Sequence, residues 1–270
     1  MGSIREYWRL YRVLAGAYVR SRLQYRLSFW LGVFVTVITD LVPLLLIGIV
    51  FTRFPALHGW HWRDIALLYG LDQLAFGLVR CFSRQIDTFD NSIVSGDFDS
   101  VLIRPLPPLF HLLAARFEIV ELGRLSAGVV ILILAARSAG VPFTAANVAV
   151  ALAAVIGGAM ILFSFILMAA TVSFWQTRAG KLQDLIQASG RAFADYPLTI
   201  YPAGVRWLLT FALPLALITY YPGQRLLGRN ESGALLPVLS TAAAPAGLVL
   251  LGIAGLVWRA GLRHYQSTGS

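Results

Sequence analysis

The sequence predicts an all-α integral membrane protein with six transmembrane helices. Of its 270 residues, 58% are hydrophobic and only 13% are charged, whereas soluble domains carry about 25% charged residues. The mean hydropathy is +0.72. The apolar residues fall in long runs, and a helix needs about 20 of them to cross a membrane.

Four of these runs are clearly long and apolar enough to cross a membrane, and two are weaker candidates. The run at 64–86 contains Asp72 and Arg80, and the run at 205–222 is short and interrupted by Pro214. We treat the chain as one transmembrane domain over 1–270. The predicted spans are 27–51, 64–86, 107–136, 144–175, 205–222 and 242–260.

The orientation follows from the basic residues beside the spans, because arginine and lysine are enriched in cytoplasmic loops. With a cytoplasmic N-terminus, most of them fall on the inner side. The outer gaps receive Arg53, Arg63, Arg137, Arg225 and Arg229. Both termini are therefore predicted to be cytoplasmic. Membrane topology explains the net charge of +9 better than nucleic-acid binding, which we do not expect.

The last outer gap, 223–241, contains an apolar stretch. This stretch is Leu235, Leu236, Pro237, Val238 and Leu239. Irregular backbone can enter a membrane where protein buries it. Residues 230–241 are therefore either a simple loop or a segment that dips into the membrane.

Residues 4–26 are predicted to form an amphipathic helix on the inner membrane surface. Apolar residues recur there at helical spacing, with arginines largely to one side, which is typical of helices lying on anionic lipid. The alternative is an ordinary positively charged flank of the first span. The residues assigned to this interfacial helix are Arg5, Trp8, Arg9, Arg12, Arg20 and Arg22.

Charged residues within the spans form a second group of candidates. Asp40 and Asp72 are the aspartates placed inside predicted spans away from their ends, and a charge there costs about 2.5–3.5 kcal/mol on insertion scales. Pairing within the bundle or lining of a polar pathway would explain them. Glu118, Glu121 and Arg124 open the third span. Glu121 and Arg124 share a helix face at three residues' spacing, as a fixed ion pair or as a gate.

The sequence offers no candidate for catalysis or metal binding. It has no G-x-x-x-x-G-K-[ST] phosphate loop, so we do not expect ATP hydrolysis by that mechanism. Its 4 histidines are scattered, and Cys81 is the only cysteine, which excludes a cysteine-based metal site. We expect no catalytic residue, no metal and no cofactor on this chain.

The segment 87–106 is the strongest candidate for a functional element. It carries Asp87, Asp90, Asp97 and Asp99 in a chain with few acids, yet it is too apolar for a solvated linker. This composition indicates a docking element for a soluble partner. The residues assigned to it are Ile93, Val94, Gly96, Asp97, Phe98, Asp99, Leu102, Arg104 and Pro105.

Taken together, the chain resembles the membrane subunit of a type-2 ABC transporter, and within that group the bacterial ABC-2 family transporter proteins. The stretch from Gly96 to Pro105 matches the family pattern G-x-hydrophobic-D-x-x-L-x-R-P. A second match is YPLTIYPAG at 196–204, followed by Pro214 and by YPGQRLLG at 221–228. The resemblance covers essentially the whole length.

The resemblance implies a permease, and by analogy an exporter, in the bacterial cytoplasmic (inner) membrane. Segment 87–106 would be a coupling helix docked on a separate cytoplasmic ABC ATPase. Two ATPase copies would bind ATP and Mg, and a second permease, identical or a sister chain, would complete the pathway. The alternative is a secondary transporter that uses Asp40 and Asp72 as ion sites, without an ATPase.

In the coupling role, the side chains of the segment divide into two kinds. Apolar residues would supply the anchor, and charged residues would supply a polar rim, as at other protein interfaces. The expected anchor is Ile93, Val94, Phe98 and Leu102. The expected rim is Asp97, Asp99 and Arg104. Pro105, which lacks an N–H, is expected to end the loop and start the third span.

Overall fold

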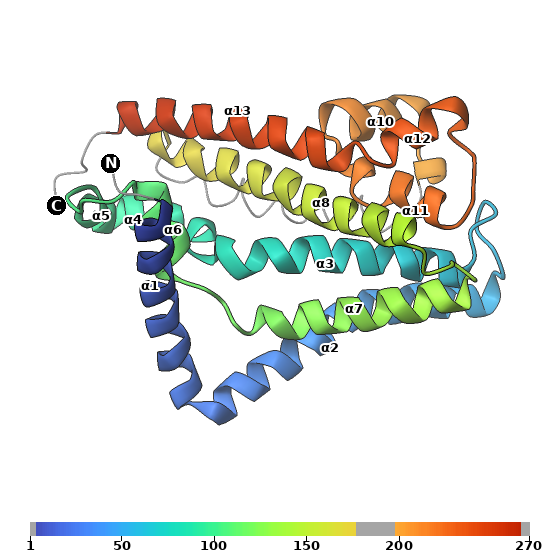
Figure 1. The fold of residues 1–270 in the computed structure, drawn as a ribbon, viewed down its shortest axis with the longest axis horizontal. Helices are drawn as coiled ribbons and strands as arrows, with labels where there is room; N and C mark the ends of the chain where they lie inside the picture. Colours follow the sequence, from blue (N-terminus) through green and yellow to red (C-terminus); the bar gives the residue numbers. More distant parts are fainter. Residues whose placement is uncertain (1–3, 177–197, 266–270) are drawn as a thin grey trace.

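The computed structural model describes residues 4–176 and 198–265. Their secondary structure is helical, apart from one isolated bridge between Leu57 and Trp60. The long helices run roughly along the length of the molecule (Figure 1). They are α2 (Arg26–Arg53), α3 (Trp62–Asp87), α7 (Glu121–Ser138), α8 (Ala145–Thr171) and α13 (Ala243–His264).

Short helices occupy both ends of this bundle (Figure 1). The end that we name the α5 end holds α4 (Phe89–Val94), α5 (Asp97–Leu102) and α6 (Pro108–Ala115). The opposite end, named the α11 end, holds α10 (Ala203–Trp207), α11 (Tyr220–Leu226) and α12 (Leu236–Leu239).

The first helix, α1 (Ile4–Gln24), lies across the direction of the long helices at the α5 end (Figure 1). The chain turns into α2 at Tyr25, whose side chain is exposed. A helix perpendicular to the spans lies in the plane of the membrane that the spans cross. The interfacial position expected for residues 4–26 requires this perpendicular orientation and stays a prediction.

Helix α3 forms the centre of the bundle and is buried along most of its length between α7 and α8. Glycines allow α7 to approach it closely. A Cβ atom at Gly70 would lie 2.9 Å from the Cα of Leu132, and one at Gly77 would lie 3.0 Å from a methyl group of Leu125. Close backbone approach at small residues is the usual packing of helices in membranes.

Helices α8 and α13 cross at two further glycines. A Cβ atom at Gly157 would lie 2.3 Å from the carbonyl carbon of Ala243, and one at Gly247 would lie 2.8 Å from the Gly157 oxygen. Gly157 is about 18 Å from the start of α8 at 1.5 Å per residue. The start of α13 therefore lies beside the middle of α8, and Leu236 and Ser240 are the buried residues of 231–241.

The predicted third span, 107–136, is not one continuous helix. It consists of α6 and α7, separated by 116–120, where Arg116 is extended at φ −145°. The backbone N–H of Glu118 donates to the carbonyl of Cys81 on α3, with 3.0 Å between N and O. This tertiary bond replaces an intrahelical one, so α7 begins only at Glu121. The helix before the break begins at Pro108, three residues after the expected Pro105.

The predicted fifth span, 205–222, is also broken. Residues Ala203–Ala212 and Leu215–Leu226 form two helical segments bent by 77°, with Pro214 between them. One end lies near α2, because Ile200 lines a hollow beside Phe51. The opposite terminus of the bent pair, formed by α11, lies at the α11 end of the bundle (Figure 1). Its middle reaches deep into the bundle, where Ile218 contacts Gly158.

Among the described residues, four helices are long and apolar enough to cross a membrane, or five if the bent pair counts as one span. The four are α2, α3 with its continuation through α4, α8 with its continuation to Phe174, and α13. Helix α7 has 18 residues, about 27 Å, and carries Glu121, Arg124 and Arg137. The prediction of six spans is therefore not confirmed.

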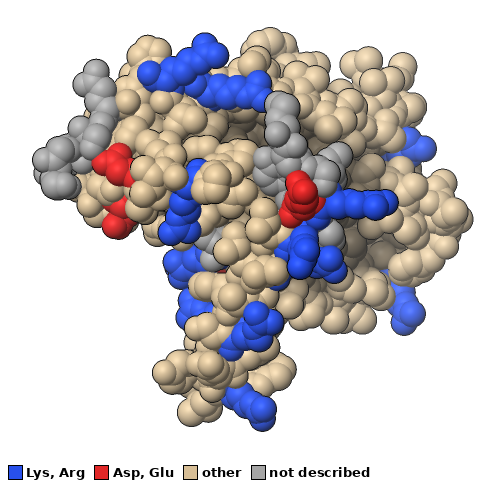
Figure 2. Space-filling view, turned by 60° about the vertical axis from the view of Figure 1, so that its left-hand side comes forward, with Lys and Arg blue, Asp and Glu red and all other residues tan. Residues whose placement is uncertain are grey.

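Both the start of α1 and the end of α13 lie at the α5 end (Figure 1). Figure 2, which turns this end forward, shows more arginine than acidic side chains. Three basic residues predicted on the same side, Arg178, Lys181 and Arg191, lie outside the described residues. Arg206, also predicted there, instead belongs to α10 at the α11 end, because the bent pair does not start where a simple crossing would.

Candidate functional site

The loop 87–106 folds into two short helices at the α5 end. Helix α4 follows α3 directly, and α5 begins after Ser95 and Gly96. Gly96 has φ +76°, a conformation that glycine adopts without steric cost. The reversal between α4 and α5 therefore depends on this glycine.

Phe98 anchors α5 inside the protein rather than on its surface. Its side chain is fully buried, and its ring packs edge to face against Phe89 (5.0 Å between centroids) and Tyr265 (5.2 Å). Phe174, after α8, and Trp258, on α13, complete this aromatic cluster. Such ring geometries contribute about 0.5–1.5 kcal/mol per pair beyond area burial. The cluster ties α5 to the ends of α8 and α13.

The expected apolar anchor therefore needs correction. Ile93, like Phe98, is buried in the protein's own core, so neither side chain is available to a partner. Val94 and Leu102 do face outward, being 57% and 38% exposed. Ile103, which was not assigned to the docking element, is 85% exposed. The signal in the sequence was its place between Leu102 and Arg104 in the matched pattern.

The aspartates of the loop have different environments. Asp97 is exposed and accepts a hydrogen bond from the hydroxyl of Ser95, with 2.6 Å between the oxygens. Asp99 accepts one from the hydroxyl of Tyr265, just past α13, at 2.9 Å. Burial of the ring, and then this hydrogen bond, raise the pKa of Tyr265 to about 12. Of the two, Asp97 suits a polar rim, whereas Asp99 is already engaged by Tyr265 of the same chain.

Arg104 and Pro105 are both exposed. The guanidinium Nη1 of Arg104 lies 3.0 Å from Nε2 of His111 on α6. This contact fixes the end of the loop on the following helix. Pro105 lies in the irregular link before α6.

Asp40 and Arg124 form a buried ion pair between α2 and α7. Nε of Arg124 lies 2.5 Å from Oδ2 of Asp40, and its Nη1 lies 3.0 Å from Oε2 of Glu121. The predicted pairing of Glu121 with Arg124 is confirmed. Asp40 is thus neutralised by pairing inside the bundle, which was the first of the two explanations for a charged residue within a span. Its backbone carbonyl also accepts from the hydroxyl of Tyr69 on α3.

Asp72 is buried on α3. Glu118 lies elsewhere, at the junction of α1 with the break before α7. Its Oε2 is 3.6 Å from Nη2 of Arg22 and 3.6 Å from Nε of Arg116. The Tyr18 hydroxyl, which accepts from Nε of Arg22, raises the pKa of Arg22.

The other arginines assigned to the interfacial helix, Arg5, Arg9, Arg12 and Arg20, are exposed. The side chain of Trp8 lies outside what the structure describes. Arginines on an exposed face of α1, which lies across the spans, suit contact with lipid headgroups. Arg22 differs from them, because it turns toward Glu118.

A polar network at the α11 end was not predicted. Nη2 of Arg229 lies 2.9 Å from Oδ2 of Asp64 at the start of α3, and its Nη1 lies 2.9 Å from Oε1 of Glu231. Its guanidinium carbon is 4.4 Å from the ring centroid of Trp60. The network fastens the segment after α11 to the loop before α3. The sequence separation of 165 residues between Arg229 and Asp64 hides this relationship.

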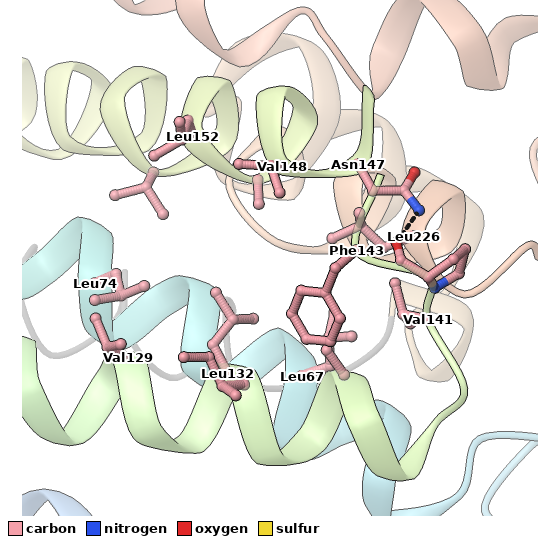
Figure 3. Close-up of a pocket in the computed structure, with 15 residues that line it drawn as sticks. Leu67, Leu74, Val129, Leu132, Val141, Phe143, Asn147, Val148, Leu152 and Leu226 are labelled. Carbon is pink, nitrogen blue, oxygen red and sulfur yellow. Dashed lines mark hydrogen bonds between the residues drawn. The ribbon is translucent and has the colours of Figure 1, made fainter. Parts of the chain in front are cut away.

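An apolar hollow of about 350 Å³ opens between α3, α7 and α8 (Figure 3). Leu67, Leu132, Val148 and Leu152 are among its lining residues. The side-chain amide of Asn147 donates to the carbonyl of Pro142, at 2.9 Å, instead of pointing free into the hollow. The hollow can accept a hydrocarbon chain but offers nothing that would recognise a charged group.

The described residues thus define a multi-pass α-helical membrane protein with a helix lying across the ends of its spans. The chain belongs to the ABC-2 family transporter proteins, whose family model matches residues 37–269. This confirms the type-2 ABC transporter permease indicated by the Gly96–Pro105 pattern. Members are membrane transport subunits, generally not enzymes themselves, and the family implies an ATPase partner. Searches of curated proteins and of solved structures find no match.

Proposed function

We propose that this chain is the membrane-spanning permease of an ATP-driven exporter in the bacterial cytoplasmic (inner) membrane. Family membership is the observation that carries the proposal. The arginines gathered at the α5 end (Figure 2) support a cytoplasmic location for that end, because positive residues are retained on the inner side. Both termini are then cytoplasmic.

In this proposal, the partner ATPase docks on the exposed side of α4 and α5. Val94, Leu102 and Ile103 are exposed apolar side chains of this segment and would form the apolar patch, and the exposed Asp97 and Arg104 would supply its charges. An apolar centre with a charged rim suits a protein interface, and the charges can set orientation and association rate. ATP and Mg would bind on two copies of the ATPase, not on this chain.

The buried aromatic cluster supplies a route from the docking face to the spans. Phe98 of α5 contacts Phe174 after α8, and the cluster includes Trp258 of α13. Close-packed interiors transmit displacement because they compress little. A force on α5 would therefore move α8 and α13 together.

A second permease, identical or a sister chain, completes the proposed transporter. Helix α2 supports this, because it contributes little to the core and exposes many large apolar side chains. Such a face suits either another protein or lipid. The secondary-transporter alternative receives no comparable support, since Arg124, which also pairs with Glu121, already neutralises Asp40.

The test is retention of the ATPase by docking-face variants during purification in mild detergent. Replacement of Ile103 by Asp, or of Val94 by Asp, places a charge in the proposed apolar patch. The matched control is Phe54→Asp, which adds the same charge at an exposed apolar position at the α11 end. We expect the first two variants to lose the ATPase and the control to retain it. Equal retention by all three would reject this docking face.

A further inference from the structure

An open polar cavity of about 480 Å³ lies where α1, α3 and the break before α7 meet at the α5 end. Its lining residues are Tyr18, Ser21, Arg22, Tyr25, Gln85 and Arg116. Every one of these side chains carries a hydrogen-bonding group, and two carry a positive charge. Nothing in the permease function described above uses this cavity.

Two guanidinium groups are held in place around the ring of Tyr18. Nε of Arg22 donates to the Tyr18 hydroxyl at 2.9 Å, and Nε of Arg116 donates to the same oxygen at 3.0 Å. Their guanidinium carbons lie 5.4 and 5.8 Å from the ring centroid. The two cations are thus positioned by a shared aromatic residue before any ligand arrives.

The charge in this cavity is not balanced by its neighbours. Glu118 is the carboxylate that the described residues bring to both arginines, at 3.6 Å from each. Two positive groups share one negative group, so the cluster keeps a net positive charge. A guanidinium has five N–H donors, and the contacts of Arg116 described here involve only its Nε. Its Nη groups are free to donate to an anion.

The surroundings of the cavity favour a lipid as the source of that anion. Tyr25, on its rim, is 72% exposed and directly precedes α2. From there, the exposed apolar side chains of Leu27, Leu31 and Phe34 follow along α2. Trp30, also exposed, is a residue typical of the headgroup level. An anion bound in the cavity can therefore have hydrocarbon chains lying along α2.

We propose that this cavity binds the phosphate of an anionic phospholipid from the leaflet at the α5 end. Bidentate hydrogen bonds between guanidinium and phosphate are the favoured geometry of such recognition. Basic pockets between membrane helices on the cytoplasmic side bind lipid headgroups in this way. The bound lipid would join α1 to α3 and to the break before α7, beside the ring contacts of Phe82 on α3 with Tyr11 and Phe117.

The test is lipid binding to the purified, delipidated chain, followed by native mass spectrometry during titration with phosphatidylglycerol. The double variant Arg22→Gln/Arg116→Gln removes both cavity cations. The control Arg259→Gln/Arg263→Gln removes the same charge from exposed positions on α13, also at the α5 end. We expect the dissociation constant of the most tightly bound phosphatidylglycerol molecule to be at least about ten-fold higher in the cavity variant than in the wild type. The control should bind it within about two-fold.

A variant expected to bind the lipid more tightly distinguishes loss of the binding site from loss of the fold. Glu118→Gln removes the competing carboxylate, so phosphatidylglycerol should bind more tightly, a gain that a damaged protein would not show. Glycerol phosphate, titrated in parallel, should bind far more weakly than the lipid. If it binds as tightly, the source is a soluble phosphate ester, and the lipid proposal is wrong. Equal weakening in the cavity variant and its control would also overturn it.

Discussion

Tyr265 donates its hydroxyl hydrogen to Oδ1 of Asp99, with 2.9 Å between the two oxygens. The residues are 166 positions apart in the chain, and the bond joins the end of α13 to the first turn of α5. The ring of the same tyrosine packs against Phe98. One side chain therefore fixes the candidate docking element to the last span through both a polar and an apolar contact.

Removing this hydroxyl should loosen α5 without dismantling the aromatic cluster. Tyr265→Phe keeps the ring but leaves Asp99 without this donor. A hydrogen bond to a charged group contributes about 1.5–3 kcal/mol, and partial exposure reduces this to about 1 kcal/mol. Thermal unfolding in detergent, followed by circular dichroism, should show a slightly lower Tm. Tyr25→Phe, at an exposed tyrosine, should show no change.

Burial of the Tyr265 ring, together with this bond, predicts a pH dependence. The folded-state pKa of Tyr265 is raised to about 12 from an ordinary value of 10.0, because the folded protein favours its protonated form. This contribution to stability is complete below about pH 10 and is lost as the pH rises toward 12. The difference in tyrosinate absorbance between wild type and Tyr265→Phe should titrate near pH 12. A midpoint near 10 would contradict this.

Phe98→Ala should behave as a core mutation. Truncating a fully buried aromatic ring costs about 3–5 kcal/mol, and here the ring contacts Phe89, Phe174 and Tyr265. Lower stability in detergent is expected even without an ATPase. Ile103→Ala, at an exposed neighbour, should cost under about 0.5 kcal/mol. If both variants were equally stable, the buried position of Phe98 would be wrong.

The contrast between Phe98 and Ile103 shows where sequence reasoning stops. The apolar, acid-bearing character of 87–106 was visible, and so were the ranges of α2, α3, α8 and α13, because their apolar runs are long. Which apolar side chain faces inward depends on partners at Phe174 and Trp258, far along the chain. Local composition carries no information about such contacts.

The two broken spans illustrate the same limit. Apolar runs at 107–136 and 205–222 are long enough to predict continuous helices. The first is interrupted because the N–H of Glu118 bonds to Cys81 on another helix. Pro214 indicated an interruption of the second span, but nothing in the sequence predicted the 77° bend between its two segments. The sequence indicated that buried charges would be paired, but it did not identify their partners. Asp40 pairs with Arg124, 84 residues away.

The Asp40–Arg124 pair should be required for folding rather than for transport. Asp40→Asn removes the closer partner of a buried guanidinium, and breaking a buried pair costs about 3–5 kcal/mol. The remaining contact with Glu121 places the expected loss near the lower value. The double variant Asp40→Asn/Arg124→Gln should recover part of the loss, because no unpaired cation remains. A double-mutant cycle of unfolding free energies measures this.

If Asp40 were instead an ion site, the outcome would differ. Asp40→Asn would then abolish transport while leaving Tm unchanged, and Arg124→Gln would not rescue it. Measuring transport and Tm on the same preparations separates the two roles. Parallel loss of both supports the structural pairing.

The crossing of α8 and α13 gives the most direct test of the packing. Gly157 and Gly252 both lie in long apolar helices, yet a Cβ atom at Gly157 would lie 2.3 Å from the backbone of Ala243, whereas one at Gly252 would meet nothing within 4 Å. Gly157→Ala should separate the helices and cost about 1–3 kcal/mol, as overpacking does. Gly252→Ala should be neutral or stabilise by up to about 1 kcal/mol, because alanine favours helix over glycine. Tm values of the two variants, measured in the same detergent, should therefore fall on opposite sides of the wild type or differ clearly. Equal Tm values would mean that α13 does not begin against the middle of α8.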